Sequence, residues 1–224
     1  MTTLPQNIKE QFFKTIKGDL SLREFEQWLY SDKELERFLN SESHFELIAI
    51  NFREGGAKYE LWKFLKNYIG LQEFEKYKML ELLNEAKQKT ERLPYILMEF
   101  YDLYCYGYNF LQDLGLGIGL AVEVPRVNNT IAETWDELTT EQQTALLNSF
   151  SPELEYCIEQ VIDWINTDKI ILTGEQDELG HYEYQDLRTE EEKKSKLWVI
   201  VSEDNETGFS TSKNLLWEKL KDRK

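Results

Sequence analysis

Residues 93–114 read LPYILMEFYDLYCYGYNFLQDL, and this stretch decides the fold. Two apolar stripes follow it at helical spacing, one through Ile96 and Phe100 and the other through Leu97. A helix that is apolar around so much of its circumference is normally buried by neighbours on several sides. We therefore expect a central helix over 93–114, in which Gly107 allows a close backbone approach or a bend.

The residues before this stretch predict a series of short helices, each beginning at its own capping signal. Three serines are each followed three residues later by a glutamate, which is the pattern of a capping box. The three pairs are Ser21 with Glu24, Ser31 with Glu34, and Ser43 with Glu46. Apolar residues at helical spacing predict two further helices, over 57–68 and 71–88.

After residue 115 the pattern changes and predicts both strands and helices. Alternating apolar residues predict a short strand over 120–124. Thr139 and the pair Ser151-Pro152 predict two helix starts, with the hydroxyl as cap and the proline at the first helical position. Three further strands are expected over 169–173, 181–185 and 197–202, and a short terminal helix over 214–221.

The expected fold is therefore α+β and helix-dominated. A multi-helix N-terminal half is followed by a smaller half with helices and a three- or four-stranded antiparallel sheet. We expect a helical domain at 1–115 and an acidic α+β domain at 130–224, or alternatively two halves that share one core.

The composition excludes several classes of protein. The chain has 224 residues, of which 41% are hydrophobic, and a net charge of −16. This charge argues against a nucleic-acid or anionic-membrane surface and favours a basic protein partner. Two cysteines form no disulfide framework, and the first ten residues lack a secretory pattern, so we expect a cytoplasmic location. The longest nearly uncharged apolar run, 114–122, is far below the roughly 18 residues that span a bilayer.

The acidity lies in the second half of the chain. Residues 1–90 carry 14 basic and 15 acidic side chains, whereas residues 91–210 carry 7 basic and 25 acidic ones, a net of −18. Glu155, Glu159 and Asp163 are spaced four residues apart and should form a ridge beside the apolar stripe of the helix after Pro152. The ridge is either a docking face for a basic partner or a solvated surface that keeps the chain soluble.

His181 is the candidate metal ligand of the sequence. Four acidic residues lie near it in the sequence, namely Asp177, Glu178, Glu183 and Asp186. In a strand, His181 and Glu183 would share a face. The spacing matches no known ligand pattern, so an ordinary hairpin is the competing interpretation. The other histidine, His44, is expected to be an ordinary residue near a helix start. We expect neither a metal nor a cofactor.

Two other chemical patterns have plain structural alternatives. Asp186 with Glu191, Glu192 and Lys193 resembles an Mg²⁺-nuclease set, but the run is more typical of the first turn and body of a solvated helix capped by Thr189. Three alternate glycines over 115–119 have the wrong spacing for a dinucleotide loop and indicate a helix stop with a close-packed turn. Cys105 and Cys157 are expected to be small packing residues.

Tyrosines are concentrated in the central stretch. Five of the twelve lie within fourteen residues, namely Tyr95, Tyr101, Tyr104, Tyr106 and Tyr108. Such a cluster suits an interface or a ligand-lined groove. It equally suits a central helix whose hydroxyl groups reach solvent or polar loops.

One resemblance is carried by the segments Phe25-Glu26-Gln27-Trp28-Leu29-Tyr30, Leu35-Glu36, Glu46-Leu47-Ile48 and Tyr59-Glu60-Leu61. Over residues 20–70 the chain resembles uncharacterised bacterial immunity-type proteins that are encoded beside polymorphic toxins. The resemblance implies a non-enzymatic protein that neutralises a toxin by occluding its active site, and the acidic half would suit a basic nuclease toxin. The alternatives are a metal-dependent hydrolase that uses His181, or a structural or regulatory protein with another partner.

Overall fold

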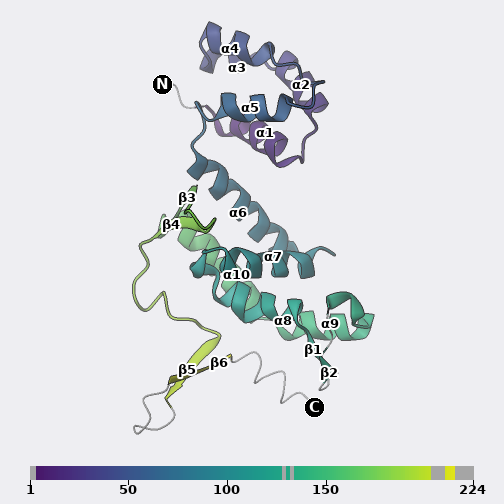
Figure 1. Cartoon of the computed structure of the whole chain (residues 1–224), viewed down its shortest axis with the longest axis vertical. Helices are drawn as coiled ribbons and strands as arrows, with labels where there is room; N and C mark the ends of the chain where they lie inside the picture. Colours follow the sequence, from purple (N-terminus) through teal and green to yellow (C-terminus); the bar gives the residue numbers. More distant parts are fainter. Residues whose placement is uncertain (1–3, 128–129, 132–133, 203–209, 215–224) are drawn as a thin grey trace. The chain divides into compact units, whose positions relative to one another are not determined.

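The computed structural model describes residues 4–127, 130–131, 134–202 and 210–214. The chain divides into two compact units, one ending at Tyr77 and the other beginning at Lys78. Helices dominate both units (Figure 1), which confirms a helix-dominated α+β fold.

Helices are the only regular secondary structure among the described residues of the first unit. Its helices are α1 (Gln6–Lys17), α2 (Leu22–Ser31), α3 (Leu35–Phe38), α4 (Ser41–Ile48), α5 (Ala57–Leu65) and the start of α6 (Leu71–Gln88). Its core is rich in aromatic rings: Phe12 lies 5.3 Å from Phe25 and 5.8 Å from Trp28, and Phe13 contacts Phe74 at 5.3 Å. These rings remove large apolar areas from water, which is the main force that holds the short helices together.

One of the three predicted capping boxes is confirmed in this unit. Ser21 and Glu24 exchange the reciprocal bonds expected at the start of α2. The other two predictions are wrong, because a stronger local acceptor lies nearby. The Asp32 carboxylate accepts the N–H groups that precede α3, and the Asn40 side chain accepts the Ser43 N–H at the start of α4.

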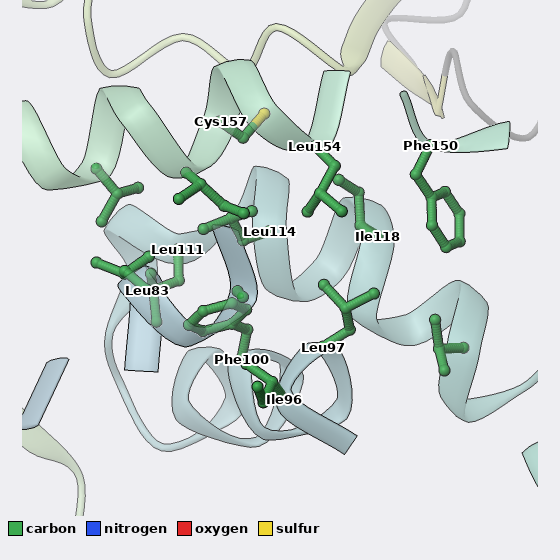
Figure 2. Close-up of a cluster of buried hydrophobic side chains, with 14 of the residues drawn as sticks. Leu83, Ile96, Leu97, Phe100, Leu111, Leu114, Ile118, Phe150, Leu154 and Cys157 are labelled. Atoms are coloured by element: carbon green, nitrogen blue, oxygen red, sulfur yellow. The ribbon is translucent and has the colours of Figure 1, made fainter. Parts of the chain in front are cut away.

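The second unit is built around α7 (Leu93–Cys105), as the sequence predicts for its central helix. Around it lie the end of α6, a short 3₁₀ turn η1 (Asn109–Leu111), a π-helix η2 (Asp113–Gly119), α8 (Leu120–Glu123), η3 (Trp135–Glu137), α9 (Thr140–Ser149) and α10 (Glu153–Asn166). Figure 2 shows side chains from α6, α7, η1, η2 and α10 converging on one cluster that includes Leu83, Phe100, Leu111, Leu114 and Leu154.

The central helix is shorter than expected and ends at Cys105. Gly107 follows in the left-handed region with φ 111°, which glycine adopts at little cost. A Cβ at this position would lie 3.0 Å from the Tyr182 carbonyl oxygen. The Tyr182 N–H also donates to the Tyr106 carbonyl oxygen at 2.7 Å. The predicted close approach at Gly107 is therefore confirmed, and it also ends the helix.

The glycine run 115–119 continues as helix instead of stopping one. A Cβ on Gly115 would lie 2.5 Å from the Phe100 carbonyl oxygen, and one on Gly119 would lie 2.2 Å from the Leu97 carbonyl oxygen. The predicted close packing is thus confirmed, because these glycines let η2 lie directly on the backbone of α7. The strand predicted over 120–124 is wrong, since these residues continue from η2 into α8.

The two later helix starts are found where we expect them. Thr139 and Gln142 form a capping box at the start of α9. The prediction that the Ser151 hydroxyl caps α10 is wrong: Pro152 is the cap residue, and the Ser151 hydroxyl donates to the Glu155 carboxylate at 2.8 Å.

The strands form three separate antiparallel pairs within the described residues, so the single three- or four-stranded sheet that we expected is not found. The pairs are β1 (Arg126–Val127) with β2 (Thr130–Ile131), β3 (Ile170–Gln176) with β4 (Tyr182–Asp186), and β5 (Trp198–Ser202) with β6 (Ser210–Asn214). Ile170 is opposite Asp186 and Leu172 opposite Tyr184. The strand β3 packs against α10 instead of a further strand. Of the predicted terminal helix, only Asn214 is described, in β6; the rest lies outside the described residues.

The division into units falls inside α6, whereas we expected a boundary between residues 115 and 130. Residues 78–114 pack in one core with residues 135–197 because α7 is covered by η2 and α10. Residues on both sides of the expected boundary therefore share a core, whereas residues before Lys78 form a core of their own.

Candidate functional site

The predicted acidic ridge lies on the solvent side of α10. The opposite face of this helix is buried and consists of Leu154, Cys157, Ile158, Val161, Trp164 and Ile165. The side chains of Glu155 and Glu159 are 36% and 62% exposed, and Asp163 is exposed. The four-residue spacing thus places all three carboxylates beside the apolar face, as predicted.

Two lysines at the end of α6 pair with this ridge. The Lys87 Nζ lies 3.0 Å from the Glu159 Oε1, and the Lys89 Nζ forms an ion pair with the Glu155 carboxylate. The Lys89 Nζ also donates to the Ser151 hydroxyl at 3.2 Å. These lysines are more than sixty residues from their partners in sequence. A sequence pattern within one helix therefore could not reveal them.

The ion pairs make the three acids unequal. Partial burial raises the pKa of Glu155, but hydrogen bonds from Lys89 and Ser151 oppose this and lower the pKa overall, so the group stays ionised. Within the described part of the chain, no ion pair involves Asp163. Within the described residues, lysines therefore form ion pairs with two of the three carboxylates, and the third, Asp163, has only a weaker Coulombic attraction to Lys169.

His181 belongs to a turn and not to a cluster of ligands. The Asp177 carboxylate accepts the backbone N–H groups of His181 and Leu179 at 2.8 Å each, and its other oxygen lies 3.2 Å from the His181 Nδ1. These backbone bonds to His181 and Leu179, with the imidazole, lower the pKa of Asp177 despite slight desolvation. The loop before β4 is closed by the same carboxylate. Among the described residues, no three histidine, cysteine or acidic side chains gather at metal-binding distance.

Two other residues of the predicted metal sets, Asp186 and Glu191, have partners of their own. Asp186 accepts two bonds from the Arg188 guanidinium, at 3.0 and 2.8 Å, and Arg188 stacks over the Trp164 ring at 4.3 Å. Glu191 pairs with Lys194 at 2.6 Å. These contacts hold the loop after β4 against α10.

Glu192 acts as a structural anchor of the same loop. It pairs with Lys169 and accepts the Thr189 N–H and hydroxyl at 2.9 Å, while the Thr189 hydroxyl accepts the Glu192 N–H. The hydrogen bond from Lys169, followed by those from Thr189, lowers the pKa of Glu192 to about 2. These bonds confirm the predicted Thr189 cap, but the helix expected to follow it is not found, because residues 190–193 form a turn.

The two cysteines differ from each other. Cys157 is buried in the second core, where desolvation and the nearby Asp113 charge raise the pKa of its thiol to about 12, and it packs as expected. Cys105 is exposed, so the expectation that it packs in the core is wrong.

The tyrosine cluster near the end of α7 contains both buried and exposed side chains. Tyr108 is buried and stacks on Tyr182 at 4.7 Å, whereas Tyr95 and Tyr106 are 51% and 57% exposed. This arrangement agrees with a central helix whose exposed tyrosines reach solvent. His44 lies within α4, as expected for a residue near a helix start.

No described helix is both long and apolar enough to cross a membrane. Comparisons of the chain with models of known families, with characterised proteins and with solved structures find no match.

Proposed function

We propose that this chain is a non-enzymatic, acidic binding protein that recognises a basic protein partner in the cytoplasm. Its partner is a basic, nuclease-like bacterial toxin, and the chain acts as an immunity protein by occluding the active site of that toxin. The observation that carries the proposal is the exposed carboxylate ridge of α10, which belongs to a segment with a net charge of −18.

The ridge is suited to attract a basic surface before contact. A cluster of exposed carboxylates raises the rate of association with a positively charged surface, by 10-fold to roughly 1,000-fold in favourable cases. Asp163 forms no ion pair with a described residue, and Glu159 is paired with the exposed Lys87. Because exposed ion pairs contribute only about 0 to 1 kcal/mol, an arginine or lysine of the partner can replace Lys87 at little cost.

The test begins with the product of the gene that lies beside this one. It is produced in a heterologous bacterium with and without this chain, and growth is measured. If the product arrests growth and this chain restores it, the immunity role is supported. If growth arrest persists despite equal levels of folded chain, that role is refuted.

The docking role of the ridge is tested by association rates with the same purified product. The variant Glu155→Gln/Glu159→Gln/Asp163→Asn should associate about 10-fold or more slowly at low salt. The matched variant Lys87→Gln/Lys89→Gln should associate faster, because it uncovers two carboxylates. The three rates should converge at 1 M salt, where charges are screened beyond about 3 Å. Equal rates at low salt would remove the ridge from docking.

A further inference from the structure

A groove lies in the first unit, far from the α10 ridge in sequence. It has a volume of about 880 Å³ and lies between α4, α5 and the loop that joins them. Its apolar lining includes Phe45 from α4, Ile50 from the loop, and Ala57 and Phe64 from α5. A hollow of this size accommodates several side chains of a bound partner.

Phe45 is the unusual residue of this groove. Its side chain is 74% exposed, although α4 already directs Leu47 into the core, where it is completely buried. The fold therefore does not use Phe45 for packing within the described residues of the first unit. A large exposed aromatic ring beside an apolar groove is typical of a binding surface.

The rim of the groove is acidic, although the surrounding sequence is not. Its lining contains four glutamates and one lysine, namely Glu42, Glu46, Glu54, Glu60 and Lys63. By contrast, residues 1–90 as a whole carry 14 basic and 15 acidic side chains. The negative charge is thus concentrated at the groove.

Most of these glutamates have no cationic partner among the residues that the structure describes. Glu54 accepts a hydrogen bond from the Asn51 amide at 2.7 Å. Glu42, Glu46 and Glu60 make no ion pair with any described residue, in contrast to Glu155 and Glu159 of α10. Their charges are available to a ligand.

We propose that this groove binds a basic amphipathic helix of a partner protein. The apolar face of that helix covers Phe45 and the groove lining, and its lysine or arginine residues pair with the rim glutamates. Glu42 and Glu46 are one helical turn apart, about 6 Å along the axis of α4, which matches cations spaced four residues apart on a partner helix. This site is separate from the α10 ridge, on which the proposed function rests, and its test uses no toxin. Either proposal can therefore fail without the other.

The test measures binding of the full-length chain to a labelled synthetic peptide by fluorescence anisotropy. The peptide contains leucine and lysine in helical periodicity and spans about four turns, or about 14 residues. We expect it to bind, and we expect Phe45→Ser and Glu42→Lys/Glu46→Lys each to weaken binding by about 10-fold or more. A peptide with glutamate in place of lysine should not bind.

Matched variants outside the groove control for general attraction to an acidic protein. Tyr30→Ser changes an aromatic that is 61% exposed on α2, and Glu36→Lys reverses an exposed charge on α3. Both should alter the Kd by less than about twofold. The proposal is overturned if these controls weaken binding as much as the groove variants, or if the peptide does not bind. It is equally overturned if a peptide of the same composition with two central prolines, which prevent a helix, binds as well.

Discussion

Gly119→Ala tests how η2 packs on α7, because two physical effects oppose each other at this residue. Gly119 has helical backbone angles, φ −58° and ψ −45°. Helix propensity alone therefore predicts that alanine stabilises the chain by about 1 kcal/mol. However, the new Cβ would lie 2.2 Å from the Leu97 carbonyl oxygen, and 3.0 Å from the Tyr101 Cβ.

The steric effect should win. Overpacking usually costs about 1 to 3 kcal/mol, and here the obstructing atom belongs to the backbone of a buried helix, so it cannot rotate away. The cost should therefore lie at the upper end of this range, about 3 kcal/mol. After subtraction of the propensity gain of about 1 kcal/mol, we expect a net loss of about 2 kcal/mol, or roughly 30-fold in the unfolding equilibrium of the second unit.

Hydrogen exchange followed by mass spectrometry measures this loss locally. Amides of α7 that exchange through unfolding of the second unit should exchange about 30-fold faster in Gly119→Ala. Gly117→Ala is the matched control in the same helix, because the atom nearest to its Cβ would be the Leu197 Cδ1 at 2.9 Å, the movable tip of a side chain. If both variants exchange alike, or if Gly119→Ala exchanges more slowly than wild type, the close packing of η2 on α7 is refuted.

Three further predictions concern the core, the thiols and the acid dependence. Leu61→Ala should destabilise the first unit by about 2 to 5 kcal/mol in urea unfolding, because Leu61 is fully buried; a loss below about 0.5 kcal/mol would contradict its place in that core. In the native chain a thiol reagent should modify Cys105 rapidly and Cys157 only after unfolding; prompt modification of both in peptide mapping would contradict the burial of Cys157. Carboxyl NMR titration of Glu192 should give a pKa of about 2, and Lys169→Met should raise this pKa; an unchanged pKa in the variant would refute the pairing. Because folding lowers the pKa of Glu192, the ionised carboxylate stabilises the fold above about pH 4.5, and this stabilisation is lost as the pH falls toward 2.

Errors in the local predictions came from competition between neighbouring residues. Ser31 and Ser43 both match the capping pattern, but Asp32 and Asn40 supply acceptors that cap equally well or better at adjacent positions. The alternation over 120–124 predicts a strand only if the glycines before it stop the preceding helix. In the structure the helix continues through these glycines, because Gly115 and Gly119 have no side chain that would keep η2 from lying against the backbone of α7.

The sequence by itself determined the features that depend on residues within one or two helical turns. These include the capping boxes at Ser21 and Thr139, the amphipathic face of α10, and the special backbone at Gly107. Each is recognisable because its partners are close in the chain and their spacing follows the helical repeat.

Only the tertiary structure decided which distant residues meet. It brought Lys87 and Lys89 to the acidic ridge, where they pair with two of the three carboxylates that the sequence presents as equivalent. It also paired the strands in twos and left Phe45 exposed above a groove between α4 and α5. Such contacts depend on how whole helices pack, and packing sums many weak contacts between residues far apart in sequence, so no short pattern encodes it.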